Sequence, residues 1–117
     1  MTSITRIKEN HLMSQVVRYD HFIETAGQVC ADTSLDIQGQ THQVLAQIDQ
    51  LLSQVGASKQ DLTRVQIWLA DIDDFAEMNV AYEAWLANCP KPVRACVGSD
   101  LVSGGYLIEV QAFAYIK

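Results

Sequence analysis

An arginine and a glutamate interrupt two apolar segments near the C-terminal end of the sequence. Arg94 lies within PVRACV, and Glu109 lies within YLIEVQAFA. Burying a charge in such surroundings costs free energy unless the charge is paired with an opposite charge or serves a function. A guanidinium is well suited to bidentate capture of a small carboxylate, and a partly desolvated glutamate can orient or deprotonate a water molecule. Two interpretations follow: a buried ion pair that ties subunits together, or a ligand site at a subunit junction.

The other residues able to do chemistry form weaker patterns. Cys96 follows Arg94 by two residues and shares its side of a strand, so it is a candidate pocket residue, although a strand cysteine is more often a small core residue. The histidines have no metal-ligand spacing, and the cysteines are three and widely spaced: His11, His21, His42, Cys30, Cys89, Cys96. No phosphate-binding glycine motif is present. We therefore expect no metal site and no disulfide framework.

The hydropathy pattern predicts the elements that must position these residues. Apolar residues at three- and four-residue steps predict a helix over 36–55, which Gly56 ends. A second helix is expected from Asp73 or Asp74 and stops before Pro90. The remaining β-prone segments predict a short edge strand, a hairpin around a turn at 19–21, a central strand and two final strands, over 4–8, 14–27, 62–70, 93–98 and 107–116.

This order of elements predicts one α+β domain over residues 1–117, with a mixed sheet and two helices on one face. Alternation in the last strand directs Ile108 and Val110 toward the helices and Glu109 away from them. We place Arg94 on the same helix-free face as Glu109. That face also carries aromatic residues such as Phe113, so we expect a second subunit to cover it.

Composition and charge narrow the class of protein. The 117 residues are 49% apolar and 19% charged, which is typical of a globular chain. A net charge of −6 and scattered lysines and arginines argue against nucleic acid as a partner. The N-terminal segment lacks the apolar region of a secretory signal, and no apolar run reaches the length of a membrane span. A reduced, cytoplasmic protein without a membrane partner is expected.

Several segments together resemble a known family. They are SQVV, TAGQV, DIQGQTHQVLAQIDQLLSQVGASKQDL, IWLADIDDFAEMNVAYEAW, PVRACV and YLIEVQAFA, and their order and spacing are similar to those of the Rid family, also called YjgF. The resemblance covers the chain from about Ser14 to Ala114. The missing LP after the arginine strand, and the tryptophans of IWLAD and YEAW, resemble a branch distinct from the best-described imine deaminases.

The resemblance implies a fold, an assembly and a chemistry. The fold would be chorismate-mutase-like, in a homotrimer with clefts at the subunit junctions. Deaminases of this family hydrolyse reactive enamines and imines to 2-keto acids and ammonia, with neither metal nor cofactor. By position, Arg94 would hold the substrate carboxylate, Glu109 would assist the attacking water, and Cys96 would contact ligand or water through its main chain. Gly27 would lie in a loop of the pocket, and Asn79, which matches a recurrent asparagine of the second helix, would contact the substrate.

Two departures from the family pattern bear on function. Met13 stands where the deaminases commonly have a tyrosine, and Ala26 stands where they commonly have a serine. Both changes remove polar pocket groups and leave Arg94 and Glu109 in place. The resemblance thus supports a hydrolase of 2-imino acids, with a non-catalytic module that binds a small carboxylate metabolite as the alternative. A third function, endoribonuclease or translation inhibitor, is disfavoured by the acidic charge.

Overall fold

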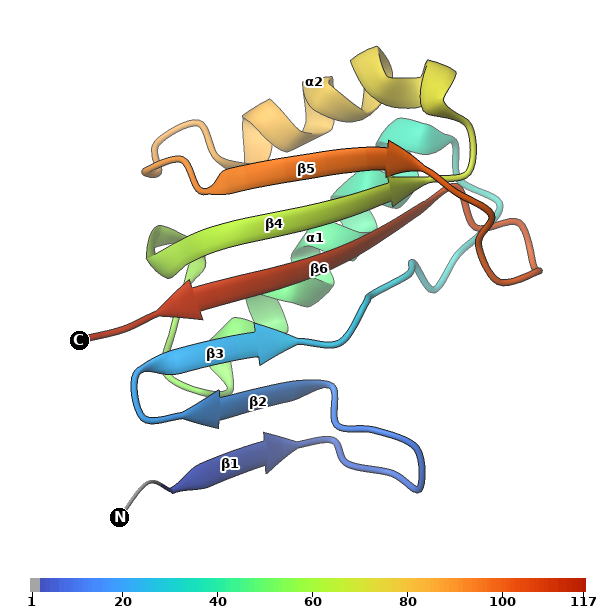
Figure 1. Cartoon of the computed structure of the whole chain (residues 1–117). Coiled ribbons are helices and arrows are strands. Elements are labelled where there is room, and N and C mark those ends of the chain that lie inside the picture. Colours follow the sequence, from blue (N-terminus) through green and yellow to red (C-terminus); the bar gives the residue numbers. More distant parts are fainter. Residues whose placement is uncertain (1–2) are drawn as a thin grey trace.

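The computed structural model describes residues 3–117, so the first two residues of the expected domain 1–117 lie outside the described part (Figure 1). The expected order of strands and helices is confirmed. The strands are β1 (Ile4–Ile7), β2 (Val16–Tyr19), β3 (Phe22–Thr25), β4 (Leu62–Leu69), β5 (Val93–Gly98) and β6 (Ile108–Tyr115). The helices are α1 (Ile37–Ser53) and α2 (Phe75–Trp85), with short 3₁₀ turns at Lys59–Asp61 and Ile72–Asp74.

The described strands form one mixed sheet in the order β1-β2-β3-β6-β4-β5. Only β4 and β5 run parallel, because the chain crosses between them through α2; the other neighbours are antiparallel. The mixed α+β architecture expected from the sequence is confirmed. The edge strands are β1 and β5, and β5 is the strand that carries Arg94.

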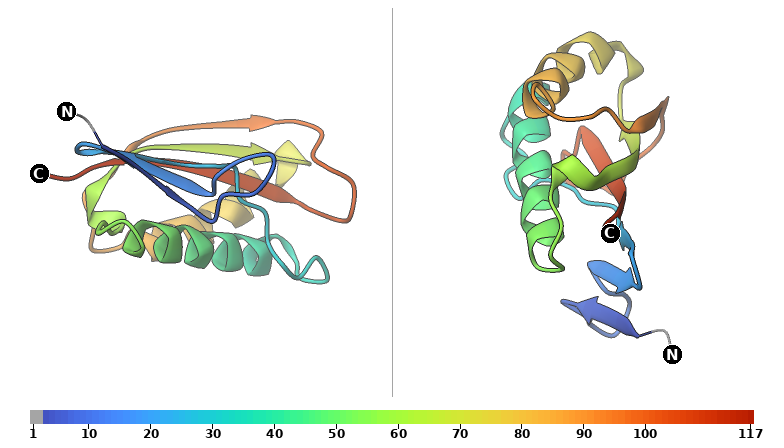
Figure 2. Two further views of the ribbon diagram at one scale, coloured as in Figure 1. Left: turned by 90° about the horizontal axis from the view of Figure 1, so that it is seen from below. Right: turned by 90° about the vertical axis from the view of Figure 1, so that its left-hand side faces the viewer.

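Both helices pack on one face of the sheet, and the described residues leave the other face uncovered (Figure 2). Local signals set the ends of α1. The Asp36 side chain accepts a hydrogen bond from the Gly39 backbone N–H at 2.8 Å, as an N-cap residue does. After the helix, Gly56 adopts a φ of +81°, a left-handed conformation that glycine adopts at little cost. Neither helix is long and apolar enough to cross a membrane.

The register of the sheet separates Arg94 from Glu109. Arg94 pairs with Val65, which is fully buried beneath the helices, so the arginine side chain projects to the helix-covered face. Glu109 pairs with Trp68 and projects to the uncovered face. The prediction that both charges share the helix-free face is therefore wrong for Arg94. The uncovered side of β5 instead carries Val93 and Val97, which are 70% and 45% exposed.

Candidate functional site

Arg94 is held against α2 by uncharged groups. Its Nη1 donates a hydrogen bond to Oδ1 of Asn79 at 2.7 Å. Its guanidinium carbon lies 4.7 Å from the ring centre of Tyr82 and 5.5 Å from that of Phe75. Both distances are within the range of cation–π attraction. Among residues 3–117, no carboxylate forms an ion pair with this half-buried cation, so its charge stays uncompensated within the chain.

Cys96 lies on the same side of β5 as Arg94, as the alternation predicts. It is half-buried and packs against the hydrophobic core. Burial raises the pKa of its thiol, and the positive charge of Arg94 opposes that rise only in part. The side chain is therefore a neutral thiol near neutral pH and is not an activated nucleophile. The expected main-chain contact of position 96 with ligand or water stays a prediction.

Glu109 and Gly27 form a second group on the opposite face of the sheet. The backbone of Gln28 bridges to that of Val110 through two hydrogen bonds, of 2.7 and 2.9 Å, which place the 26–29 segment beside β6. The Glu109 carboxylate then occupies the space beside Gly27 that a side chain at position 27 would fill. A Cβ added at position 27 would overlap Oε2 of Glu109 and would lie 3.0 Å from its Cδ. Only glycine therefore lets the carboxylate occupy its present position.

A glutamine network that the sequence reading did not single out holds the Gly27 segment. Gln28 is 8% exposed, and its Nε2 donates to Oε1 of Gln15 at 2.8 Å and to the Ala26 carbonyl at 3.3 Å. From α1, the Nε2 of Gln47 donates to the Val29 carbonyl at 3.0 Å. These bonds satisfy buried polar groups and fix the backbone beside Glu109.

Gln40 shows the same use of a glutamine in the core. Gln40 is a polar residue of α1 outside its predicted apolar positions, yet it is fully buried. Its Nε2 donates to the carbonyls of Leu35 and Gly105, at 3.2 and 3.1 Å, and its Oε1 accepts from the Leu107 backbone at 2.9 Å. It thereby joins the loop before α1 to the loop that leads into β6. The signal that could have found it is its spacing, three residues after Ile37 and four before Val44, both of which are buried.

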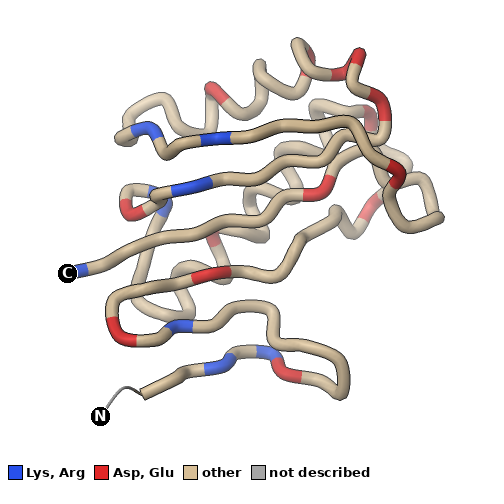
Figure 3. The backbone as a smooth tube through the Cα atoms, in the orientation of Figure 1, with Lys and Arg blue, Asp and Glu red and all other residues tan. Residues whose placement is uncertain are grey.

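The predicted site residues thus form two groups within one chain. Arg94, Cys96 and Asn79 lie at the β5 edge on the helix side, and Gly27 and Glu109 lie on the uncovered face. The strand β4 separates β5 from β6 (Figure 3). One chain by itself therefore does not bring Arg94 and Glu109 to one cleft. Within residues 3–117, no cluster of three histidine, cysteine or acidic side chains is arranged to hold a metal ion.

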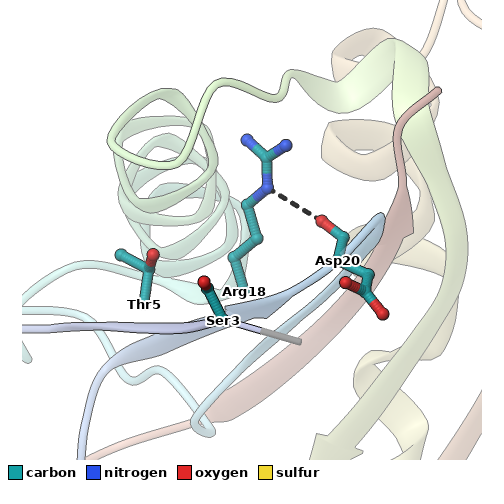
Figure 4. A pocket seen from close by; sticks show the side chains of 4 residues that line it. All are labelled: Ser3, Thr5, Arg18 and Asp20. Atoms are coloured by element: carbon teal, nitrogen blue, oxygen red, sulfur yellow. Dashed lines mark hydrogen bonds between the residues drawn. The ribbon is translucent and has the colours of Figure 1, made fainter. Parts of the chain in front are cut away.

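A hollow lies elsewhere on the molecule, near the β1 edge, and is lined by Ser3, Thr5, Arg18 and Asp20 (Figure 4). Arg18 extends across it and donates from Nε to the Asp20 carbonyl at 3.1 Å and from Nη1 to the Val55 carbonyl at 2.8 Å. Its hydrogen bonds hold the end of α1 to the hairpin turn. None of the predicted site residues lines this hollow.

Comparison with known proteins defines the family. The sequence pattern of the endoribonuclease L-PSP family matches residues 3–116. A RutC family protein of Haemophilus ducreyi is 34% identical over 114 residues, 97% of each chain, and the RutC family protein YoaB of Escherichia coli is 34% identical over 97% of this chain and 99% of its own. The chain belongs to this family, also known as Rid or YjgF, and the resemblance stated from the sequence is confirmed.

Solved structures agree with this assignment. An uncharacterised protein of Pseudomonas aeruginosa has a TM-score of 0.93 at 30% identity, covering 98% of this chain and 100% of its own. A YjgF family member of Neisseria meningitidis also has a TM-score of 0.93, at 31% identity, covering 98% of this chain and 96% of its own. The mixed sheet with two helices on one face is thus the fold of the YjgF family.

Proposed function

We propose that the protein hydrolyses reactive 2-imino and 2-enamino acids to 2-keto acids and ammonia, at clefts between the subunits of a homotrimer. The observation that carries this proposal is the uncompensated charge of Arg94. A permanently charged, planar guanidinium, held by a neutral amide and two rings, is ready to pair with a substrate carboxylate. A structural arginine would be expected to bond an acidic side chain or backbone carbonyls, and within residues 3–117 Arg94 bonds neither.

The separation of the two groups supports a site that two subunits share. One subunit would contribute Arg94 and Cys96 from its β5 edge, and its neighbour would contribute Gly27 and Glu109 from its uncovered face. The exposed valines on β5, Val93 and Val97, supply apolar surface for that contact. The shared site replaces the expectation that both charges come from one face of one chain.

The chemistry needs only these groups and water. With the carboxylate on Arg94, Glu109 accepts a proton from a water molecule whose oxygen adds to the carbon of the C=N bond. Glu109 passes this proton to the nitrogen, which gives the carbinolamine. The hydroxyl group then gives up its own proton, which completes the ammonia leaving group, and the C–N bond breaks as the C=O bond of the 2-keto acid forms. An enamine enters the same sequence after protonation at carbon gives the imine. The Cys96 thiol stays protonated and forms no covalent intermediate.

A non-catalytic function is the alternative, and two residues favour it. Met13 and Ala26 stand where the family's deaminases have polar pocket groups, and Met13 is half-exposed. With those groups absent, the same cleft would bind a small carboxylate metabolite without converting it. Ligand binding that raises the melting temperature without turnover is the expected behaviour of such a module.

An oxidase-coupled assay separates the two functions. An amino-acid oxidase generates 2-imino acids in place, and release of 2-keto acid is followed with and without the protein. We expect faster release for several imino acids. If release stays at the uncatalysed rate while pyruvate raises the melting temperature, the binding module is the correct function. Sedimentation equilibrium gives the assembly: a trimer is expected, and a monomer at micromolar concentration overturns the shared site.

Mixed oligomers test whether two subunits build each site. Arg94→Ala and Glu109→Gln subunits, each expected to be much less active than the wild type, are unfolded together, refolded and assayed. In a cyclic trimer that holds both kinds of subunit, one junction combines an intact Arg94 with an intact Glu109, so random mixing restores about a quarter of the sites. If activity stays at the level of the separate variants although mixed trimers form, both residues of a site come from the same subunit.

A further inference from the structure

One face of α2 surrounds the Arg94 guanidinium. Phe75, Asn79 and Tyr82 follow each other at steps of four and three residues, which places them on the same side of a helix. The two rings flank the guanidinium carbon at 5.5 and 4.7 Å, and the amide oxygen between them accepts from Nη1. Tyr82 is buried and Asn79 half-buried. We call this group the α2 clamp.

We infer that Asn79 is a positioning residue whose neutrality keeps the Arg94 charge available to a ligand. This inference rests on the proposed carboxylate capture at Arg94. It gives Asn79 a different task from the substrate contact expected by resemblance, because its oxygen is already used by the arginine. An aspartate has almost the same shape and would accept the same hydrogen bond, but it would also neutralise the guanidinium.

The three clamp residues divide the work between orientation and charge. The rings attract the cation through their π faces without donating or accepting a proton, and the amide fixes one edge of the planar group. Nη1 is engaged by Asn79, and within residues 3–117 this is the single hydrogen bond that holds the guanidinium. The clamp thus restricts the plane of the arginine and leaves donors for a second, bidentate partner.

The substitution Asn79→Asp distinguishes this task from a merely structural one. A structural asparagine that only bonds Arg94 predicts that Asn79→Asp behaves as the wild type or is more stable. The inference predicts instead that Asn79→Asp folds normally and binds anions much more weakly. Asn79→Ala, which frees the guanidinium but leaves its charge, should lose less affinity than Asn79→Asp. Asn88→Asp is the matched control, because it adds the same charge at an exposed position after α2.

The experiment is a calorimetric titration of the intact oligomer with pyruvate, for the wild type and the three variants. We expect equal affinity for the wild type and Asn88→Asp, a loss of about tenfold or more for Asn79→Asp, and a smaller loss for Asn79→Ala. Affinity of Asn79→Asp equal to that of the wild type overturns the inference. Equal losses in Asn79→Asp and Asn88→Asp also overturn it, because net charge would then be the cause.

A second measurement keeps this test separate from the proposed function. Nitrogen-15 spectra of the arginine side chains report how fast the Arg94 guanidinium rotates. Slow rotation in the wild type and faster rotation in Asn79→Ala are expected from the clamp, whether or not pyruvate binds. If the wild type binds no pyruvate but the rotation differs as expected, carboxylate capture fails and the clamp stands. Equal rotation in both proteins overturns the clamp itself.

Discussion

Two half-buried arginines lie near opposite edges of the sheet, and their partners differ in kind. Arg18 on β2 donates to two backbone carbonyls, of Asp20 and Val55, and thereby joins a hairpin turn to the end of α1. Arg94 on β5 donates to one side-chain amide and is flanked by two rings. Both side chains are cations among largely apolar elements, so residue type alone does not tell which one is structural.

The two arginines differ in the tasks of their hydrogen bonds and in whether their charge remains available to a ligand. Arg18 supplies a donor to the Val55 carbonyl, two residues after the end of α1, and so holds the segment that leaves the helix. The hollow beside Arg18 is therefore bordered by an arginine that already has a structural task (Figure 4). Within residues 3–117, Arg94 bonds no backbone group, and it lies at an edge strand that a partner can approach. If Arg94 binds a carboxylate as proposed, the partners of a cation indicate an anion site better than a surface hollow does.

The largest expected effect is that of removing the Arg94 side chain. Arg94→Ala should lose about a hundredfold or more in turnover of imino acids, because charge-assisted bidentate bonds in a dry site contribute several kcal/mol. Arg94→Lys should not restore it, since an ammonium lacks the planar fork. The oxidase-coupled rates of both variants check this. A lysine variant as active as the wild type would show that any cation suffices at this position.

The fold was largely predictable from the sequence, and the reasons are local. The apolar steps of α1, the capping residue Asp36 and the stop at Gly56 act within a few residues, so the pattern locates the helix. The side of Arg94 was not predictable in this way. Successive residues of β5 point to opposite sides of the strand, and both sides carry apolar residues. The more apolar side, which includes Val93 and Val97, is the exposed one. An edge strand can present such a set to a neighbouring subunit.

The arrangement of the candidate site was likewise not predictable from local sequence patterns. Gly27 and Glu109 are far apart in the sequence, and their contact depends on the bridge between Gln28 and Val110. No local pattern encodes that bridge. Likewise, Gln40 reads as a polar helix position until the two loops that it bonds are known. The residue pattern singled out Arg94, Glu109 and Cys96, and resemblance to a family added Gly27 and Asn79. The arrangement of the chain then divided these residues between two faces.

The second effect concerns Glu109, whose charge we expect to serve turnover and not binding. Glu109→Gln keeps the shape and should slow turnover by about tenfold or more while pyruvate affinity changes little. Gly27→Ala should have a similar effect by another route, because its methyl group would displace the carboxylate. Rates and calorimetric affinities of both variants check this. If Glu109→Gln loses pyruvate binding while Arg94→Ala keeps it, the roles of the two charges are reversed.

The third effect concerns Arg18, whose loss we expect to lower stability and to leave activity unchanged. Arg18→Ala removes two hydrogen bonds from a charged donor to backbone carbonyls, so the free energy of unfolding should fall by about 1–3 kcal/mol. Turnover per folded molecule should stay unchanged. Urea denaturation and the oxidase-coupled assay measure the two quantities. If Arg18→Ala is as stable as the wild type but loses pyruvate binding, Arg18 and its hollow are the anion site.

The smallest effect uses the Cys96 thiol to sense the charge of Arg94. Burial raises the pKa of this thiol, and the neighbouring guanidinium lowers it in part. Only the thiolate reacts with iodoacetamide, so removal of the guanidinium should raise the pKa further and slow alkylation at pH 8.5 by a factor of about two to five. Mass spectrometry of the peptide that contains Cys96 gives its rate separately from those of Cys30 and Cys89, which are buried and serve as internal references. Arg18→Ala should leave the Cys96 rate unchanged, because that arginine lies near the other edge of the sheet. Faster alkylation in Arg94→Ala would mean that the arginine mainly shields the thiol, and that its charge is already screened within the chain.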